Sequence, residues 1–267
     1  MLEKPGDRDD IPPAALADRA HQRELSLAKR REIIQAYYAS ITLMDACVGK
    51  LLDALDRLKL ADNTIVVFFS DHGYHLGQHG LWQKSDLFEG SARVPLILSV
   101  PGMKNEGQAS DSLAELIDLY PTLAEYCGLP PKEGLDGRSF APVLHKPDTR
   151  WNTPTLTTMG FKNHSLRGPR YRYTRYADGS EELYDHQNDP MEWRNLTTDQ
   201  GMEAVKARFR SLLPQHDEPE TPKNDIDNKR MRRTLSKIKG MSRELKDQAE
   251  ANTLDSDFVK KIYSETK

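Results

Sequence analysis

The run TIVVFFS at residues 64–70 constrains the fold of this chain more than any other feature. It is continuously apolar and rich in β-branched and aromatic residues. Such a run is typical of a strand buried on both faces, usually in a parallel sheet between helix layers. The run VPLILSVPG at residues 94–102 repeats the pattern and ends at a Pro-Gly turn. Two strands of this kind need helices to cover them.

Helical periodicity stands on both sides of these strands. Apolar residues recur every three or four positions over about residues 24–60 and again over about residues 110–127. Gly128 is well placed to end the second helix. The order helix, strand, loop, strand, helix predicts an α/β fold.

The pattern changes after Trp151. Short alternating or aromatic-rich segments predict a small antiparallel sheet, with a hairpin that closes at Asp178-Gly179. A helix over about residues 199–213 is expected to pack against this sheet. The sequence thus predicts three parts: residues 1–150 as the α/β part, residues 151–213 as a small antiparallel-sheet subdomain and residues 214–267 as a polar, charged tail.

Composition limits the partners. Of the 267 residues, 37% are hydrophobic and 30% are charged, and the net charge of -3 indicates no nucleic-acid partner. The basic stretch at residues 229–243 has no interleaved aromatic residues, so we expect a solvated tail there. No segment approaches the roughly 20 apolar residues of a membrane helix, and no signal peptide is recognisable. Cys47 and Cys127 are expected to be small buried hydrophobes.

The loop between the two strands carries the candidate chemistry. Asp71 and His72 are the first polar side chains after the first strand, at the kind of strand end where α/β folds bind ligands. A carboxylate and an imidazole can hold a cation there, although a turn cap and a packed histidine are an equally good reading of an isolated Asp-His-Gly. Lys84 lies where the chain returns over the same edge. Its ammonium can therefore reach a bound phosphate or sulfate.

Other polar residues of the loop are less distinctive. His75 and His79 have the spacing of a metal pair on a helix, but nearby glycines argue against a helix. Substrate contact and loop packing stay equally open for both. Glu89 and Arg93 are four residues apart and are predicted to form a pair that fixes the loop.

Four collinear stretches resemble the type I sulfatases, and most closely the iduronate-2-sulfatase subgroup. They are YYASITLMDACVGKLLDALDRL, TIVVFFSDHGYHLGQHGLWQKSDLFEGSARVPLILSVPG, ELIDLYPTLAEYCGLPPKEGLDGRSFAPVL and RGPRYRYTRYADGSEELYDHQNDPMEWRNL. The resemblance implies an alkaline-phosphatase-like α/β fold, with a large sheet between helices and a small C-terminal antiparallel subdomain. It also implies that this chain is the C-terminal portion and that N-terminal strands of the sheet are absent.

The resemblance also assigns roles. Asp71 and His72 would be metal ligands, Lys84 would bind the sulfate oxygens and assist the leaving group, and Tyr74 would lie beside the sugar. We place His75 with Tyr74 among the substrate-binding residues. The implied cofactor is a divalent metal ion, which is calcium in this family, although calcium prefers oxygen ligands to histidine. The implied substrate is a sulfated carbohydrate.

The family's nucleophile is a formylglycine made from Cys or Ser in the motif C/S-x-P/A-x-R. Neither Cys47 nor Cys127 stands in this motif, and we expect no serine to replace them. We therefore expect the isolated chain to lack turnover and the missing N-terminal half to be its partner. An export signal would precede Met1, so a periplasmic, secreted or lysosomal-type location depends on the full-length protein.

Two other functions stay open at this point. One is a phosphate or phosphonate ester hydrolase of the same superfamily, which usually has further Asp and His ligands for a second metal. The other is a non-catalytic binding module that keeps the fold and uses its basic tail to contact a partner.

Overall fold

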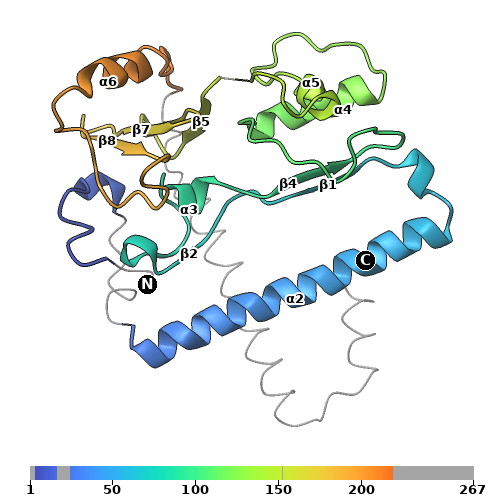
Figure 1. Ribbon diagram of the computed structural model, residues 1–267, viewed down its shortest axis with the longest axis horizontal. Coiled ribbons are helices and arrows are strands. Elements are labelled where there is room, and N and C mark those ends of the chain that lie inside the picture. Colours follow the sequence, from blue (N-terminus) through green and yellow to red (C-terminus); the bar gives the residue numbers. More distant parts are fainter. Residues whose placement is uncertain (1–3, 17–24, 152, 219–267) are drawn as a thin grey trace, which may run out of the picture. The chain divides into compact units, whose positions relative to one another are not determined.

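The helix expected before the first strand is one helix of 31 residues, α2 (Leu27–Arg57), in the computed structural model (Figure 1). The structure describes residues 4–16, 25–151 and 153–218. From residue 219 onward the expected tail, with its basic stretch at 229–243, lies outside the described residues. Within the described part of the chain, no helix has the length and apolarity needed to cross a lipid bilayer.

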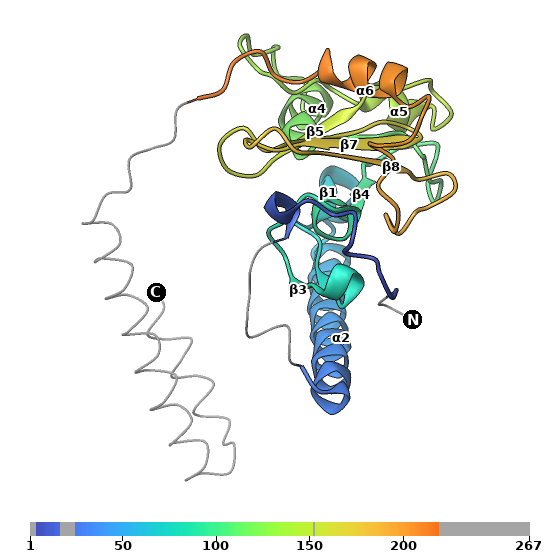
Figure 2. The ribbon, with the colours of Figure 1, turned by 90° about the vertical axis from the view of Figure 1, so that its left-hand side faces the viewer.

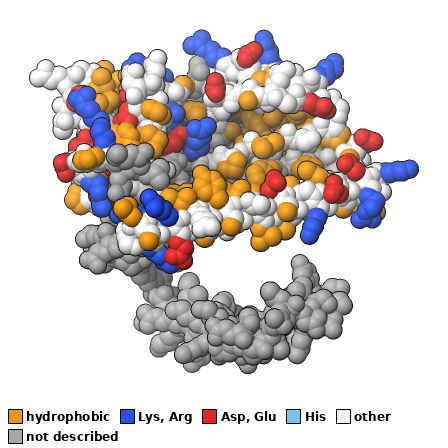
Figure 3. All heavy atoms as spheres, turned by 60° about the horizontal axis from the view of Figure 1, so that its bottom comes forward, with side chains coloured by type: hydrophobic (Ala, Val, Ile, Leu, Met, Phe, Trp, Pro, Cys, Tyr) orange, Lys and Arg blue, Asp and Glu red, His pale blue; other side chains and the backbone are white. Residues whose placement is uncertain are grey.

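No residue of α2 is buried within the described part of the chain. Leu27 is 72% exposed, and Leu43 and Leu51 are each 68% exposed. Figure 3 shows hydrophobic side chains gathered on the side of the molecule that carries this helix. A long amphipathic helix normally gains its stability by packing its apolar face against a neighbour. This face of α2 is therefore a surface suited to a further layer.

The two cysteines do not behave as expected. Cys47 lies on α2 and Cys127 follows α4 (Leu119–Tyr126), and both are exposed in the structure. The expectation that both are buried is therefore wrong. Cys47 is exposed because the helix that carries it is not covered.

The two apolar runs form β1 (Val66–Phe69) and β4 (Leu96–Ser99). They pair antiparallel, with Val66 opposite Ser99 and Phe69 opposite Leu96, so the expected parallel pairing is wrong for these two strands. A continuous apolar run indicates burial on two faces, but it does not fix the direction of the neighbouring strand. The sheet has two strands in the described residues, so both outer edges are open.

Helices lie on both sides of the β1–β4 pair, as the α/β prediction requires (Figure 1). On one side α4 (Leu119–Tyr126) and α5 (Ala141–His145) supply the buried residues Leu119 and Val143, which pack with Val67, Leu96 and Leu98. The helix expected over residues 110–127 is thus shorter, since only η4 (Leu116–Asp118) precedes α4. Gly128, with φ +64°, follows its end as predicted.

Short elements fill the connections. They are η1 (Pro13–Ala15), η2 (Ala61–Asn63), β2 (His75–Leu76), η3 (Gln78–Gly80), β3 (Trp82–Gln83) and α3 (Glu89–Ala92). β2 and β3 pair antiparallel and form a small ribbon within the loop between β1 and β4.

The expected small antiparallel sheet is present. Its strands pair in chain order: β5 (Thr155–Thr158), β6 (His164–Arg167), β7 (Tyr171–Arg175) and β8 (Glu181–Asp185). The hairpin between β7 and β8 closes at Asp178-Gly179, where Gly179 has φ +87° and donates to Tyr176 O. α6 (Glu203–Arg210), shorter than expected, covers one face of the sheet (Figure 2).

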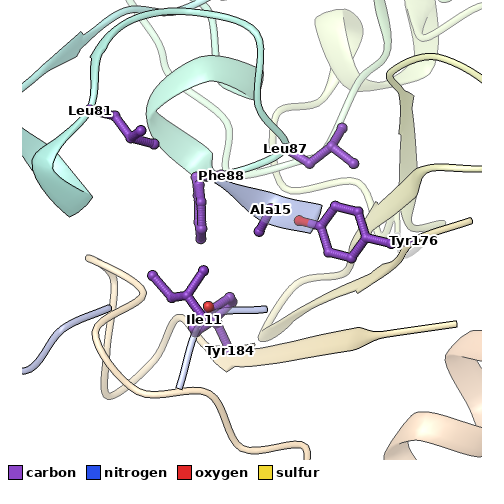
Figure 4. Packing of buried hydrophobic residues seen from close by; sticks show 7 residues of the cluster. All are labelled: Ile11, Ala15, Leu81, Leu87, Phe88, Tyr176 and Tyr184. Carbon is purple, nitrogen blue, oxygen red and sulfur yellow. The ribbon is translucent and has the colours of Figure 1, made fainter. Parts of the chain in front are cut away.

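The two faces of this sheet bury different clusters. Leu166, Tyr173 and Leu183 of the sheet pack with Phe209 of α6. On the opposite face Tyr184 packs with Phe88 from the loop and with Ile11 near the N-terminus (Figure 4). Leu183 and Tyr184 face opposite sides of the sheet because successive side chains of a strand alternate between its two faces. Packing on this face therefore joins the subdomain to the loop and to residues 4–16.

A buried carboxyl group lies against this second cluster. Glu182 is 1% exposed and accepts hydrogen bonds from Tyr176 Oη at 2.5 Å and Tyr184 Oη at 2.7 Å. Burial raises the pKa of Glu182 to about 7, against an ordinary value of 4.5. Between pH 4.5 and about 7, Glu182 is protonated in the folded chain and ionised in the unfolded chain.

We predict that Glu182→Gln flattens the pH dependence of stability in this window. The folded pKa is raised, so stability falls as pH rises from 4.5 to about 7. The total loss is about 3 kcal/mol. Urea unfolding followed by circular dichroism at several pH values measures this slope. Glu133→Gln, on an exposed loop, is the control, and an unchanged slope in Glu182→Gln would contradict the prediction.

Candidate active site

Asp71, His72 and Lys84 lie together at the edge of a cavity of about 1720 Å³. The cavity runs along β4, and its other walls come from residues 103–117, α5 and β5. The site residues therefore share one hollow with an apolar sheet face. The prediction that the returning loop brings Lys84 back to the end of the first strand is met by this arrangement.

The contacts among the three side chains are short. Lys84 Nζ lies 2.5 Å from His72 Nε2, and Asp71 Oδ1 lies 3.5 Å from the same nitrogen. The Asp71 side chain is 81% exposed and that of His72 is 32% exposed. An ammonium, an imidazole nitrogen and a carboxylate thus converge at a solvent-accessible position.

The second ring nitrogen of His72 fixes its orientation. His72 Nδ1 lies 2.7 Å from Gly73 O, and because a carbonyl oxygen only accepts, Nδ1 carries the proton. Lys84 Nζ, which can only donate, lies 2.5 Å from Nε2, so Nε2 presents its lone pair to Lys84. A backbone carbonyl that orients a histidine in this way is a common support of metal ligands.

Backbone strain flanks Lys84. Gln83 has φ 98° and Ser85 has φ 80°, a region that residues other than glycine seldom adopt. Strained residues of this kind concentrate at functional sites, where the surrounding structure holds them. The lysine is thus presented by a backbone whose shape is set by tertiary packing.

Tyr74 and His75 are not among the residues that line the cavity. The Tyr74 ring lies 5.2 Å from the ring of Tyr37 on α2. His75 is 0% exposed, and its Nε2 lies 3.0 Å from Asp86 Oδ1. Since Asp86 also accepts from Phe88 N and Ser91 Oγ, His75 belongs to the packed interior of the loop. Direct substrate contact by His75 is not compatible with this burial.

His79 is also a packing residue. It is 2% exposed, its Nδ1 lies 3.1 Å from Asp7 Oδ2, and its ring stacks on Phe88 at 4.3 Å. Of the two readings of His79, the structure therefore favours loop packing.

Sequence reasoning missed the residues that hold the loop against the small sheet. Arg172 Nε of β7 lies 2.8 Å from Glu192 Oε1, and these side chains are only 3% and 1% exposed. Glu192 Oε2 accepts from Glu89 N at 2.7 Å, and Arg172 also forms an ion pair with Glu89. The predicted Glu89–Arg93 pair exists at 3.8 Å, but Arg93 is 78% exposed and so holds the loop less firmly.

The same cluster contains three groups with metal-ligand spacing. Oxygen or nitrogen atoms of Glu89, His186 and Glu192 lie within 4.8 Å of one another. The Arg172 guanidinium already supplies a positive charge there. Burial alone would raise the pKa of Glu192, but Arg172 and His186 outweigh it and lower that pKa. This is a buried ion-pair cluster, and a metal is better sought at His72.

Two family models match the chain. Residues 7–129 match the model described as Sulfatase, and residues 77–219 match the model described as N-sulphoglucosamine sulphohydrolase, C-terminal. The chain belongs to the sulfatase family.

Curated sulfatases agree with this assignment. The chain is 34% identical to a sulfatase of Formosa agariphila over 78% of its own length and 42% of that protein. It is 40% identical to the iduronate 2-sulfatase of Homo sapiens over 69% of its own length and 47% of that protein. The chain therefore spans less than half the length of these relatives.

Solved structures show the same fold. A 2-O GAG sulfatase aligns with a TM-score of 0.66 at 28% identity, covering 72% of this chain and 44% of that one. The phosphonate monoester hydrolase of Agrobacterium radiobacter aligns with a TM-score of 0.65 at 26% identity, covering 71% and 42%. The predicted alkaline-phosphatase-like α/β class is confirmed for the part of the sulfatase fold that this chain spans.

One serine does fit the loosest form of the sulfatase nucleophile motif, contrary to expectation. Ser26-Leu-Ala-Lys-Arg has the required spacing. In the structure Ser26 is the N-cap of α2, and its Oγ accepts from Lys29 N at 3.2 Å. A capping role explains this serine, since Ser is among the preferred N-cap residues.

We predict that Ser85→Gly stabilises this sulfatase chain. Glycine adopts φ 80° without strain, so the free energy of unfolding should rise by about 1 kcal/mol. Ser40→Gly, within α2, is the control and should lower it by about 0.5 kcal/mol, the difference in helix propensity between serine and glycine. Chemical denaturation measures both, and a loss of stability in Ser85→Gly would contradict the prediction.

We also predict that Arg172→Met destabilises the chain by about 3–5 kcal/mol, because it leaves the buried Glu192 carboxylate without its main partner. Arg170→Met is the matched control. Arg170 lies two residues away and pairs with Asp185, but its side chain is 48% exposed, so its loss should cost far less. Equal effects of the two substitutions in thermal unfolding would show that burial of the Arg172 pair does not matter.

Proposed function

We propose that these residues are the C-terminal portion of a sulfatase that hydrolyses sulfate esters of carbohydrates, similar to iduronate 2-sulfatase. The observation that carries the proposal is the convergence of Asp71, His72 and Lys84 at one cavity edge. Relatives support the substrate class, since one solved neighbour binds D-glucosamine-2-N,6-O-disulfate and another is a 2-O GAG sulfatase.

Lys84 is the proposed catalytic residue. Its Nζ can donate hydrogen bonds to sulfate oxygens and can deliver a proton to the leaving oxygen of the sugar. Its exposed position at the cavity edge gives an ester access to it. Tyr74, next to Tyr37, is proposed to contact the sugar ring through its aromatic face. His75 is proposed to position the loop through Asp86, in place of the substrate contact first assigned to it.

Asp71 and His72 are proposed to hold a divalent metal ion, calcium by family. The lone pair of His72 Nε2 and the nearby Asp71 carboxylate fit a cation. Calcium takes about 6–8 ligands, so these two residues form part of a site. When bound, the metal supplies positive charge that polarises the sulfate ester.

The remaining ligands and the nucleophile are proposed to come from the N-terminal half of the enzyme. The open edges of β1 and β4 and the exposed face of α2 form the proposed contact surface for that half. Phe69 is 48% exposed and Ile97 is 61% exposed, so the sheet offers apolar side chains as well as backbone groups. Unpaired strand edges of this kind readily accept a further strand.

We predict that the chain alone does not hydrolyse an aryl sulfate, because the one segment with the spacing of the formylglycine motif begins at Ser26, whose side chain caps α2. Mixing or co-expression with the N-terminal half of a related sulfatase should restore hydrolysis. Lys84→Met should abolish the restored activity by removing the proton donor and the charge.

An aryl phosphate and an aryl phosphonate monoester are assayed in parallel. Preference for either one over the sulfate would favour the hydrolase class to which the Agrobacterium radiobacter neighbour belongs. Sulfate hydrolysis by the chain alone would contradict the proposed need for another half. A complemented complex that hydrolyses none of these esters would support a non-catalytic module.

A further inference from the structure

We propose that Lys84 and the divalent cation compete for one lone pair of His72, so that cation binding transfers the Lys84 ammonium from His72 to the anionic ester. This inference rests on the proposed sulfatase function. It adds an order of events to the roles of the individual residues: the cation binds first, and the Lys84 ammonium then turns to the ester.

The ring of His72 has one nitrogen that can accept, Nε2. Nδ1 donates its proton to Gly73 O at 2.7 Å, and Nε2 lies 2.5 Å from Lys84 Nζ, which can only donate, so Nε2 has the lone pair available to a cation or to a donor. A ring nitrogen has a single lone pair. It can accept from an ammonium or coordinate a metal ion, but it cannot do both.

The Lys84 ammonium occupies that lone pair. Lys84 Nζ lies 2.5 Å from His72 Nε2, and Asp71 Oδ1 lies 3.5 Å from the same nitrogen. The ammonium therefore stands beside the two groups proposed to hold the cation, and it carries the same sign of charge. A cation bound by Asp71 and His72 repels this ammonium over a few ångströms as well as removing its acceptor.

Lys84 combines a constrained main chain with an exposed side chain. Its main chain is held between Gln83 at φ 98° and Ser85 at φ 80°, so the backbone position is fixed by the fold. The side chain itself is long and exposed, and it borders the same cavity as Asp71 and His72. Displacement is therefore a rotation of the side chain, and the cavity edge keeps Nζ within reach of an ester bound to the cation.

The consequence is an ordered site. Without the cation, the Lys84 ammonium donates to His72 and is less available to donate to sulfate oxygens. With the cation bound, the Lys84 ammonium is released from His72 and can turn toward the substrate. The cation then acts on catalysis through Lys84 in addition to its direct effect on the ester.

A double-mutant cycle on the 267-residue chain tests this proposal. Calcium affinity is measured by calorimetry for the wild type, Lys84→Met, His72→Ala and the double variant. Removal of Lys84 should tighten calcium binding about tenfold when His72 is present, within the range of coupling energies for residues in contact. In the His72→Ala background the same change should have a much smaller effect.

Lys104→Met is the matched control, since Lys104 is exposed and directly precedes a segment that lines the same cavity. It removes the same charge without affecting His72 and should alter calcium affinity little. Equal effects of Lys84→Met in both His72 backgrounds would overturn competition and leave only charge repulsion. No measurable calcium binding by either wild type or Lys84→Met would also overturn it.

A second readout follows the amine directly. Acetylation of Lys84 by a limiting amine reagent, quantified by mass spectrometry relative to Lys104, should increase severalfold on addition of saturating calcium. In His72→Ala it should be high from the start and insensitive to calcium. Unchanged reactivity in the wild type overturns the inference. Neither calcium binding nor acetylation requires hydrolysis. Failure of the competition between Lys84 and the cation is therefore distinguishable from failure of the proposed sulfatase activity.

Discussion

The buried ion pair between Arg172 and Glu192 is the interaction on which the rest of the site depends. Arg172 belongs to the small sheet, while Glu192 receives the backbone N–H of Glu89 at the start of α3, 103 residues earlier in the chain. Both charges are almost completely buried, so each requires the other. Through this cluster the loop that presents Lys84 is fixed to a rigid sheet. The loop therefore has a defined shape in spite of its glycines and its strained backbone.

The candidate cation site has only part of its ligands in this chain, and the fold has exposed apolar surface that a further layer could cover. Asp71 and His72 offer two groups to a cation that takes more, and α2 and the β1–β4 pair carry exposed apolar residues, among them Leu43, Phe69 and Ile97. In our proposal a second half of the sulfatase fold completes both at once. The sheet carries the site at the ends of its strands, so added strands and added ligands would arrive together.

Much of the local structure could be predicted from the sequence. α2, the β1 and β4 runs and the turn at Asp178-Gly179 follow from periodicity and turn chemistry, which act within a few residues. The antiparallel pairing of β1 with β4 and the shortened helix before Tyr126 could not be predicted. Strand direction and helix onset depend on distant packing, and an apolar pattern does not record which neighbour supplies it.

The sequence by itself determined the family, the order of elements and the residue types that gather at the end of β1. Only the tertiary structure decided which of these side chains face the cavity. His72 and His75 are three residues apart, yet one presents its lone pair to Lys84 and the other is buried against Asp86. The physical reason is that burial and hydrogen-bond partners depend on contacts between segments far apart in the chain. Composition and spacing carry no information about those contacts.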